Sequence, residues 1–154
     1  MLTEEETREL QSLVNEYPTR QSACVEALKA VQHRRGWISD DNLRDVADYL
    51  GMTAEELEGV ATFYSLIFRR PVGRHIIRLC DSVSCWILGS DNILRRLTET
   101  LGVSLGETTP DGRFTLLSTA CLGDCHRAPA MMIDEDLIDD LDGRSMEEIL
   151  ARYP

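Results

Sequence analysis

The chain has 154 residues, of which 43% are hydrophobic and 28% are charged. This composition is typical of a folded globular protein and excludes a disordered or collagen-like chain. The formal net charge of −11 argues against a nucleic acid or an anionic membrane as partner. No apolar run approaches the roughly 18 residues of a membrane span, and Met1-Leu-Thr-Glu-Glu-Glu does not resemble a signal peptide. We therefore expect a cytoplasmic or cytoplasm-facing protein without direct membrane insertion.

Residues 1–62 carry the pattern of four amphipathic helices. Thr3 and Glu6 form a capping box, and the apolar residues that follow recur at helical spacing until Pro18. A second helix is expected from about Arg20 to Gly36. A third helix is expected to be capped by Ser39 or Asp40, and a fourth by Thr53, which pairs with Glu56 in another capping box. Their apolar faces carry Leu43, Val46, Leu50, Leu57 and Ala61. The sequence therefore predicts an N-terminal helical bundle over residues 1–62.

From residue 63 the pattern changes to strands that alternate with helices. A short apolar run, 66–68, is followed by a strand over 75–79, and a helix capped at Ser90 ends at Gly102. A second strand over 114–118 comes before a hairpin over 131–138 and a last helix from Ser145. This order is that of a thioredoxin-like domain. We predict an α+β protein in which a thioredoxin-like α/β domain occupies residues 63–154.

Four cysteines stand in two short-range pairs, each just after a predicted strand. Cys80 and Cys85 form a C-x4-C pair, and Cys121 and Cys125 form a C-x3-C pair. Because functional sites in α/β folds gather at strand ends, we expect the two pairs to meet at one edge of the sheet. Thiolates are strong ligands for soft metal ions and for iron–sulfur clusters.

The spacing of the cysteines leaves three interpretations open. A 2Fe-2S cluster takes two thiolates on each iron, so each loop could supply one pair, and we favour this interpretation. Zinc sites with four cysteines also use close pairs, although C-x4-C is at the wide edge of that range. Disulfides or plain thiols are the third interpretation. The redox motif C-x-x-C is absent, which disfavours thiol–disulfide chemistry.

The fifth cysteine, Cys24, lies on the apolar stripe of the second predicted helix. It has no other cysteine within five residues. Free cysteine is among the most buried residue types, so we expect Cys24 to pack in the core and not to bind metal.

Several segments together resemble one known family. They are Ala61-Thr-Phe-Tyr-Ser, the stretch from Pro71 through Cys80-Asp-Ser, Asp111-Gly-Arg-Phe-Thr-Leu-Leu, Cys121-Leu-Gly-Asp-Cys125, and Ala128-Pro-Ala-Met-Met-Ile-Asp. The chain resembles the E-type (24 kDa) subunits of bacterial NADH:quinone oxidoreductase, respiratory complex I, over nearly its whole length.

The resemblance implies one 2Fe-2S cluster held by Cys80, Cys85, Cys121 and Cys125. It also implies docking to a flavoprotein subunit that binds NADH and FMN, contacts with other peripheral-arm subunits of the complex, and a place on the cytoplasmic side of the inner membrane. The cluster would accept an electron from FMN. No G-x-G-x-x-G or P-loop motif occurs in the chain, in agreement with an oxidoreductase subunit that has no complete active site of its own.

Three alternatives stay open. Related subunits of NAD-reducing hydrogenases and NAD-dependent formate dehydrogenases carry the same cluster beside a similar flavoprotein. A free-standing ferredoxin would shuttle electrons by diffusion. A zinc-stabilised interaction module would have no redox role.

Overall fold

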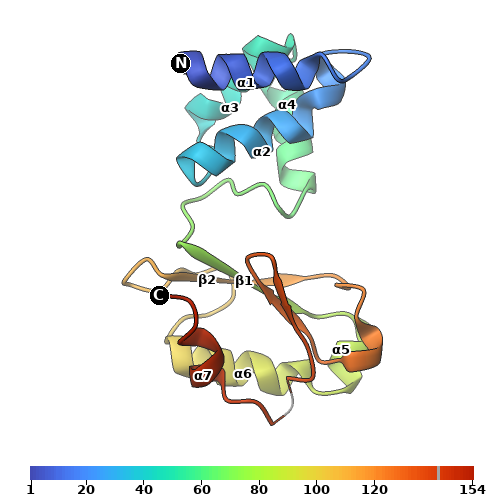
Figure 1. Cartoon of the computed structure of the whole chain (residues 1–154), viewed down its shortest axis with the longest axis vertical. Coiled ribbons are helices and arrows are strands. Elements are labelled where there is room, and N and C mark those ends of the chain that lie inside the picture. Colours follow the sequence, from blue (N-terminus) through green and yellow to red (C-terminus); the bar gives the residue numbers. More distant parts are fainter. Residues whose placement is uncertain (142) are drawn as a thin grey trace. The chain divides into compact units, whose positions relative to one another are not determined.

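The computed structural model describes residues 1–141 and 143–154 and contains two compact units, Met1–Pro71 and Val72–Pro154 (Figure 1). Unit 1 is helical, and unit 2 combines helices with a four-stranded sheet, so the predicted α+β class is confirmed. The predicted domain boundary between residues 62 and 63 stays a prediction. Among the described residues, no helix has both the length and the apolar character needed to cross a bilayer.

Unit 1 is a bundle of α-helices around an apolar core. The helices are α1 (Glu4–Val14), α2 (Cys24–Arg35), α3 (Asp40–Leu50) and α4 (Ala54–Phe63), with a 3-10 turn, η1 (Gln21–Ala23), before α2. Both predicted capping boxes are present, because Thr3 with Glu6 and Thr53 with Glu56 satisfy each other's backbone N–H groups. The core includes the fully buried side chains Leu10, Leu28, Ile38, Leu50 and Leu57.

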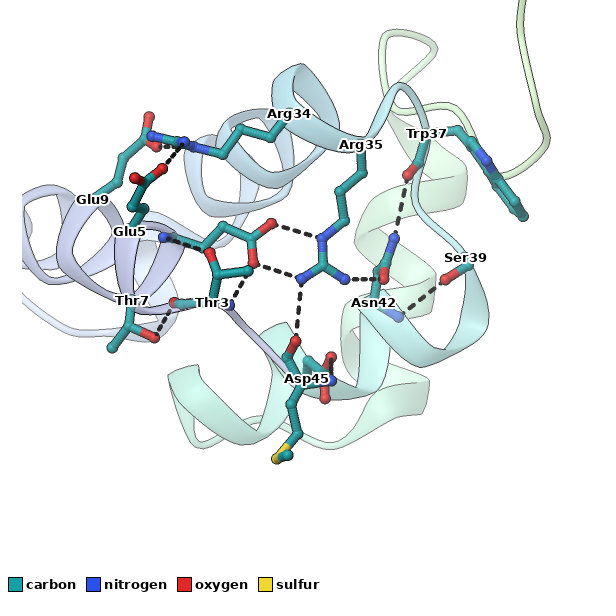
Figure 2. A network of polar contacts seen from close by, with 12 residues as sticks. Thr3, Glu5, Thr7, Glu9, Arg34, Arg35, Trp37, Ser39, Asn42 and Asp45 are labelled. Atoms are coloured by element: carbon teal, nitrogen blue, oxygen red, sulfur yellow. Dashed lines mark hydrogen bonds and ion pairs between the residues drawn. The ribbon is translucent and has the colours of Figure 1, made fainter.

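A charged side chain lies inside this bundle, and it is fully paired. Glu6 is only 3% exposed, and its carboxylate accepts hydrogen bonds of 2.6 and 2.5 Å from Nε and Nη2 of Arg35. The backbone N–H of Thr3 donates a third bond of 2.8 Å. These contacts, led by the Arg35 hydrogen bond, lower the pKa of Glu6 to about 2. Figure 2 shows Arg35 reaching toward Asn42, to which it also donates.

The apolar run 66–68, which the sequence left unassigned, forms a turn. Ile67 packs into the core of the bundle, and the side chain of Gln32 donates to the carbonyl of Leu66 and accepts from the N–H of Phe68. Because a side chain satisfies these backbone groups, the run needs no strand partner.

Unit 2 is built on a mixed sheet with strand order β2-β1-β3-β4. The strands are β1 (His75–Cys80), β2 (Phe114–Thr119), β3 (Met131–Ile133) and β4 (Asp136–Ile138). β1 pairs in parallel with β2 and antiparallel with β3, and β3 forms the predicted hairpin with β4. The helices are α5 (Val83–Ile87), α6 (Ser90–Leu101) and α7 (Met146–Leu150), and Cys125–Arg127 forms the 3-10 turn η2.

One face of the sheet is covered by helices. Figure 1 shows α6 and α7 on the same side of the strands, where Ile77 and Leu116 pack with Leu97 and Ile149 in a single apolar cluster. α6 lies in the connection from β1 to β2, and parallel strands are usually joined by such a helical crossover. The central strand β1 therefore ends next to β2, and the predicted meeting point of the cysteine loops lies there.

Candidate metal centre

The register of the parallel strands brings the two cysteine loops together. Cys80 is the last residue of β1 and lies opposite Thr119, two residues before Cys121. Backbone hydrogen bonds continue past the strands, because the N–H of Asp81 donates to the carbonyl of Thr119 at 3.0 Å. The N–H of Cys80 donates to the carbonyl of Ala130 at 3.1 Å. Both loops are thus held at the same edge of the sheet.

The first pair of thiols is buried. Cys80 and Cys85 form a small cluster with Ala130, against which Leu122 and Ala128 pack. The short helix α5 begins directly after Ser82 and carries Cys85 on its inner side. Burial raises the pKa of the Cys85 thiol to about 11, and the backbone N–H of Ala130 opposes this rise by hydrogen-bonding the sulfur.

The second pair is exposed and in direct contact. The Sγ atoms of Cys121 and Cys125 lie 3.3 Å apart. The backbone N–H of Gly123 donates to Sγ of Cys121 at 3.3 Å, and this bond lowers the pKa of that thiol. Gly123 has a φ of +89°, a conformation that suits glycine and turns its N–H toward the sulfur. The neighbouring thiol Cys121 in turn raises the pKa of Cys125.

The two pairs lie close enough to influence each other. The charges of Cys80 and Cys125 both contribute to the raised pKa of Cys85. The side chain of Ser84 partly opposes the raised pKa of Cys125, so α5 lies close to the second loop. Figure 1 shows α5 beside the turn η2. Among the described residues, no three His, Cys, Asp or Glu side chains form a group suited to a single metal ion.

Cys24 and His126 do not belong to the two thiol pairs. Cys24 belongs to unit 1 and is partly buried against the apolar core of the bundle. His126 is exposed and pairs with Asp124 at 3.2 Å. All five cysteines fall in the described part of the chain, and each is a free thiol there.

Two groups near the thiols, the Ser84 side chain and the backbone N–H of Ala130, were not expected from the sequence. Ser84 belongs to no metal-binding motif, and its helix α5 is too short to produce a periodic pattern. The backbone N–H of Ala130 comes from the start of the β3 hairpin. Such groups orient ligands and tune the metal without leaving a signature in the sequence.

Comparison with known proteins decides the family. Residues 10–154 match the family described as thioredoxin-like 2Fe-2S ferredoxin. The chain belongs to this family. It is 46% identical to the E-type subunit of NADH-quinone oxidoreductase from Pseudomonas aeruginosa over 153 residues, which cover 99% of this chain and 92% of the relative. It is 49% identical to the corresponding protein of Escherichia coli K12, again over 99% of this chain and 92% of the relative.

Solved structures show the same fold. A crystal structure of NAD+-reducing NiFe hydrogenase in the air-oxidized state matches with a TM-score of 0.68 and 26% identity. The match covers 82% of this chain but only 23% of the hydrogenase chain, so the present chain corresponds to a small part of that protein. The resemblance to the E-type subunits and the thioredoxin-like fold are thereby confirmed.

The thiols of this chain suit the cofactor of the family, which is one 2Fe-2S cluster. The chain brings four thiols to one edge of the sheet as two pairs, and such a cluster takes two thiolates on each iron. The N–H group of Gly123 donates to Sγ of Cys121, and the backbone N–H of Ala130 opposes the rise in the pKa of Cys85. Hydrogen bonds of this kind stabilise thiolates and tune the cluster that they hold.

Proposed function

We propose that this chain is the electron-transfer subunit of an NADH:quinone oxidoreductase, and that Cys80, Cys85, Cys121 and Cys125 hold its 2Fe-2S cluster. The observation that carries the proposal is the convergence of two thiol pairs where the parallel strands β1 and β2 end. When bound, such a cluster takes up and releases one electron at a time. The names of the relatives supply the class of complex.

The partner in this proposal is a flavoprotein subunit that binds NADH and FMN. NADH gives up two electrons as a hydride, which a flavin accepts and passes on singly. This chain carries no dinucleotide-binding motif, so the hydride step takes place on the partner. Other peripheral-arm subunits would hold the pair on the cytoplasmic side of the inner membrane. The helical bundle, which carries none of the proposed ligands, would serve as a docking element.

A second candidate is the equivalent subunit of an NAD-reducing hydrogenase or an NAD-dependent formate dehydrogenase. The structural match to a hydrogenase supports it. The proteins that copurify with the native chain separate the candidates, because only the first assembly reduces quinone with NADH. Copurification with a nickel–iron or formate-oxidising subunit would favour the second.

The ligand assignment is tested by metal analysis of protein purified without oxygen. We expect about two iron and two sulfide per chain, a red-brown colour that bleaches with dithionite, and an EPR signal from the reduced cluster. Serine at any of the four proposed ligands should abolish this spectrum. Cys24→Ser is the matched control and should keep it. One zinc per chain without colour would instead show the interaction module.

The electron donor is tested by reconstitution with the NADH- and FMN-binding flavoprotein that copurifies with the native chain. NADH should bleach the visible bands of the cluster only when that flavoprotein is present. Bleaching by NADH with this chain alone, or failure to bleach in the mixture, would contradict the proposal.

A further inference from the structure

The outer face of α5 is an exposed apolar surface. Val83, Trp86 and Ile87 stand at i, i+3 and i+4, so they share one side of the helix, and Leu88 follows them. These four side chains, which we call the α5 face, are between 54% and 70% exposed. Single exposed apolar residues are ordinary, but a contiguous group that includes a tryptophan is typical of a binding surface.

The α5 face also stands out by its charge. No charged residue occurs from Ser82 to Ser90, although 28% of the whole chain is charged. The exposed carboxylates of Asp81 and Asp91 border this stretch at its two ends. An apolar centre with a charged rim is the usual composition of a protein–protein interface.

The same short helix carries a proposed cluster ligand. Cys85 lies on the inner side of α5 and is buried beside Cys80, whereas Trp86 and Ile87 point outward. Ser84, next to Cys85, contacts Cys125 of the second loop. A protein that covers the α5 face would therefore come within a few side chains of the four thiols.

We propose that the α5 face is the docking surface for the FMN-carrying flavoprotein, and that Trp86 is its central anchor. This inference rests on the function proposed above. The matching surface of the flavoprotein would be an apolar hollow that accepts the indole, with basic residues around it that face Asp81 and Asp91. Tryptophan is among the residues that most often dominate the energy of an interface.

Charge argues against two other occupants. Two copies of this chain, each with a net charge of −11, would repel each other, and the acidic rim of one α5 face would meet that of the other. An anionic lipid surface would meet the same repulsion. A partner with a basic rim is the occupant that the charges favour.

The inference is tested by placing a charge in the α5 face of the cluster-loaded chain. Trp86→Glu and Ile87→Glu together should weaken binding to the flavoprotein by at least about 100-fold, because the apolar centre of the interface would be lost. Trp86→Ala is the milder variant and should weaken binding about 10- to 30-fold. NADH-driven bleaching at limiting flavoprotein should slow in the same order.

Leu105→Glu and Leu137→Glu are the matched controls. These leucines are 42% and 45% exposed and lie in unit 2 but outside the α5 face, so their variants should bind within about threefold of the unmodified chain. All variants must show the same iron content and the same dithionite-reduced spectrum. On the unmodified chain, hydroxyl-radical footprinting should show Trp86 protected by the flavoprotein, which tests the inference without any substitution.

The outcomes separate the inference from the proposed function. If the unmodified chain receives electrons from the flavoprotein but Trp86 is unprotected and its variants bind normally, the inference is wrong and the function stands. If the unmodified chain neither binds the flavoprotein nor receives electrons from it, both fall. A dimer of this chain, or binding to anionic vesicles, that Trp86→Glu abolishes would assign the α5 face to another occupant and overturn the inference.

Discussion

The two units differ in how they satisfy the polar groups that they bury. In unit 1 the buried carboxylate of Glu6 finds its counter-charge in Arg35, so this charge is compensated within the chain itself. In unit 2 the buried thiols Cys80 and Cys85 meet each other, and burial makes the ionisation of Cys85 unfavourable. Bound iron would turn these thiols into satisfied ligands. Unit 1 is thus complete without a cofactor, and unit 2 is completed by one.

Removal of the cluster should give the largest difference in stability between the two units. We expect iron chelation under reducing conditions to lower the stability of unit 2 by at least about 5 kcal/mol, because metal binding free energy is folding free energy for such a site. Amide hydrogen exchange should accelerate in β1 and in both cysteine loops. The amides of α1–α4 should keep their protection. An equal loss of protection in both units would show that unit 1 also depends on the cluster.

The buried ion pair should be the most sensitive point of unit 1. Glu6→Ala should lower its stability by about 3 kcal/mol, because Arg35 would lose its counter-charge and Thr3 its capping partner. Urea unfolding followed at the amides of α1 and α2 measures the effect. Glu9→Ala is the control, since Glu9 pairs with Arg34 at the surface and should cost less than about 0.5 kcal/mol.

The same pair should make unit 1 sensitive to acid. The pKa of Glu6 is about 2 in the folded chain and 4.5 in the reference state, so its contribution is complete above pH 4.5 and is lost as the pH falls through 2. The loss should reach up to about 3 kcal/mol. It is measured on iron-free chain as the difference between the unmodified protein and Glu6→Gln. Parallel acid profiles for the two proteins would refute this assignment.

Gly73 should tolerate no side chain. A Cβ there would lie 2.9 Å from the carbonyl carbon of Phe114 and 3.0 Å from that of Arg113, and neither backbone atom can move aside easily. Gly73→Ala should therefore destabilise unit 2 by about 2 kcal/mol and leave unit 1 unchanged. Thermal unfolding of the cluster-loaded chain, read by the visible absorbance of the cluster, measures the change.

The smallest expected effect is a gain in stability, from a substitution at Gly59. Gly59 lies within α4, is exposed, and has no atom within 4 Å of the position of a Cβ. Gly59→Ala should raise the stability of unit 1 by about 0.5–1 kcal/mol, because alanine is the better helix former. Urea midpoints of the α4 amides measure it, and a decrease would show a contact that the backbone geometry does not reveal.

The sequence was most informative where local chemistry decides the structure. The capping boxes at Thr3 and Thr53 and the hairpin around Asp134 were all predicted, because each depends on residues close together in the chain. The run 66–68 could not be assigned from the sequence, since an apolar triplet looks the same in a strand and in a turn, and the distant Gln32 decides between them.

The candidate site was predictable in its sulfurs but not in its surroundings. C-x4-C and C-x3-C predicted that the two thiol pairs would come to the same edge of the sheet, and the register of β1 and β2 places both loops there. The influence of Ser84 on Cys125 and of the Ala130 N–H on Cys85 arises from the meeting of segments that lie far apart in sequence. No periodicity within a five-residue helix could have revealed them.

The parallel register of β1 and β2 has a consequence for how this protein can vary. A shift of one residue between the strands would displace the second loop by about 3.3 Å and pull the thiol pairs apart. Extra residues in the long crossover would leave that alignment intact, whereas one extra residue between Thr119 and Cys121 would not. Length changes should therefore be tolerated far from the sulfurs along the chain and rejected within a few residues of them.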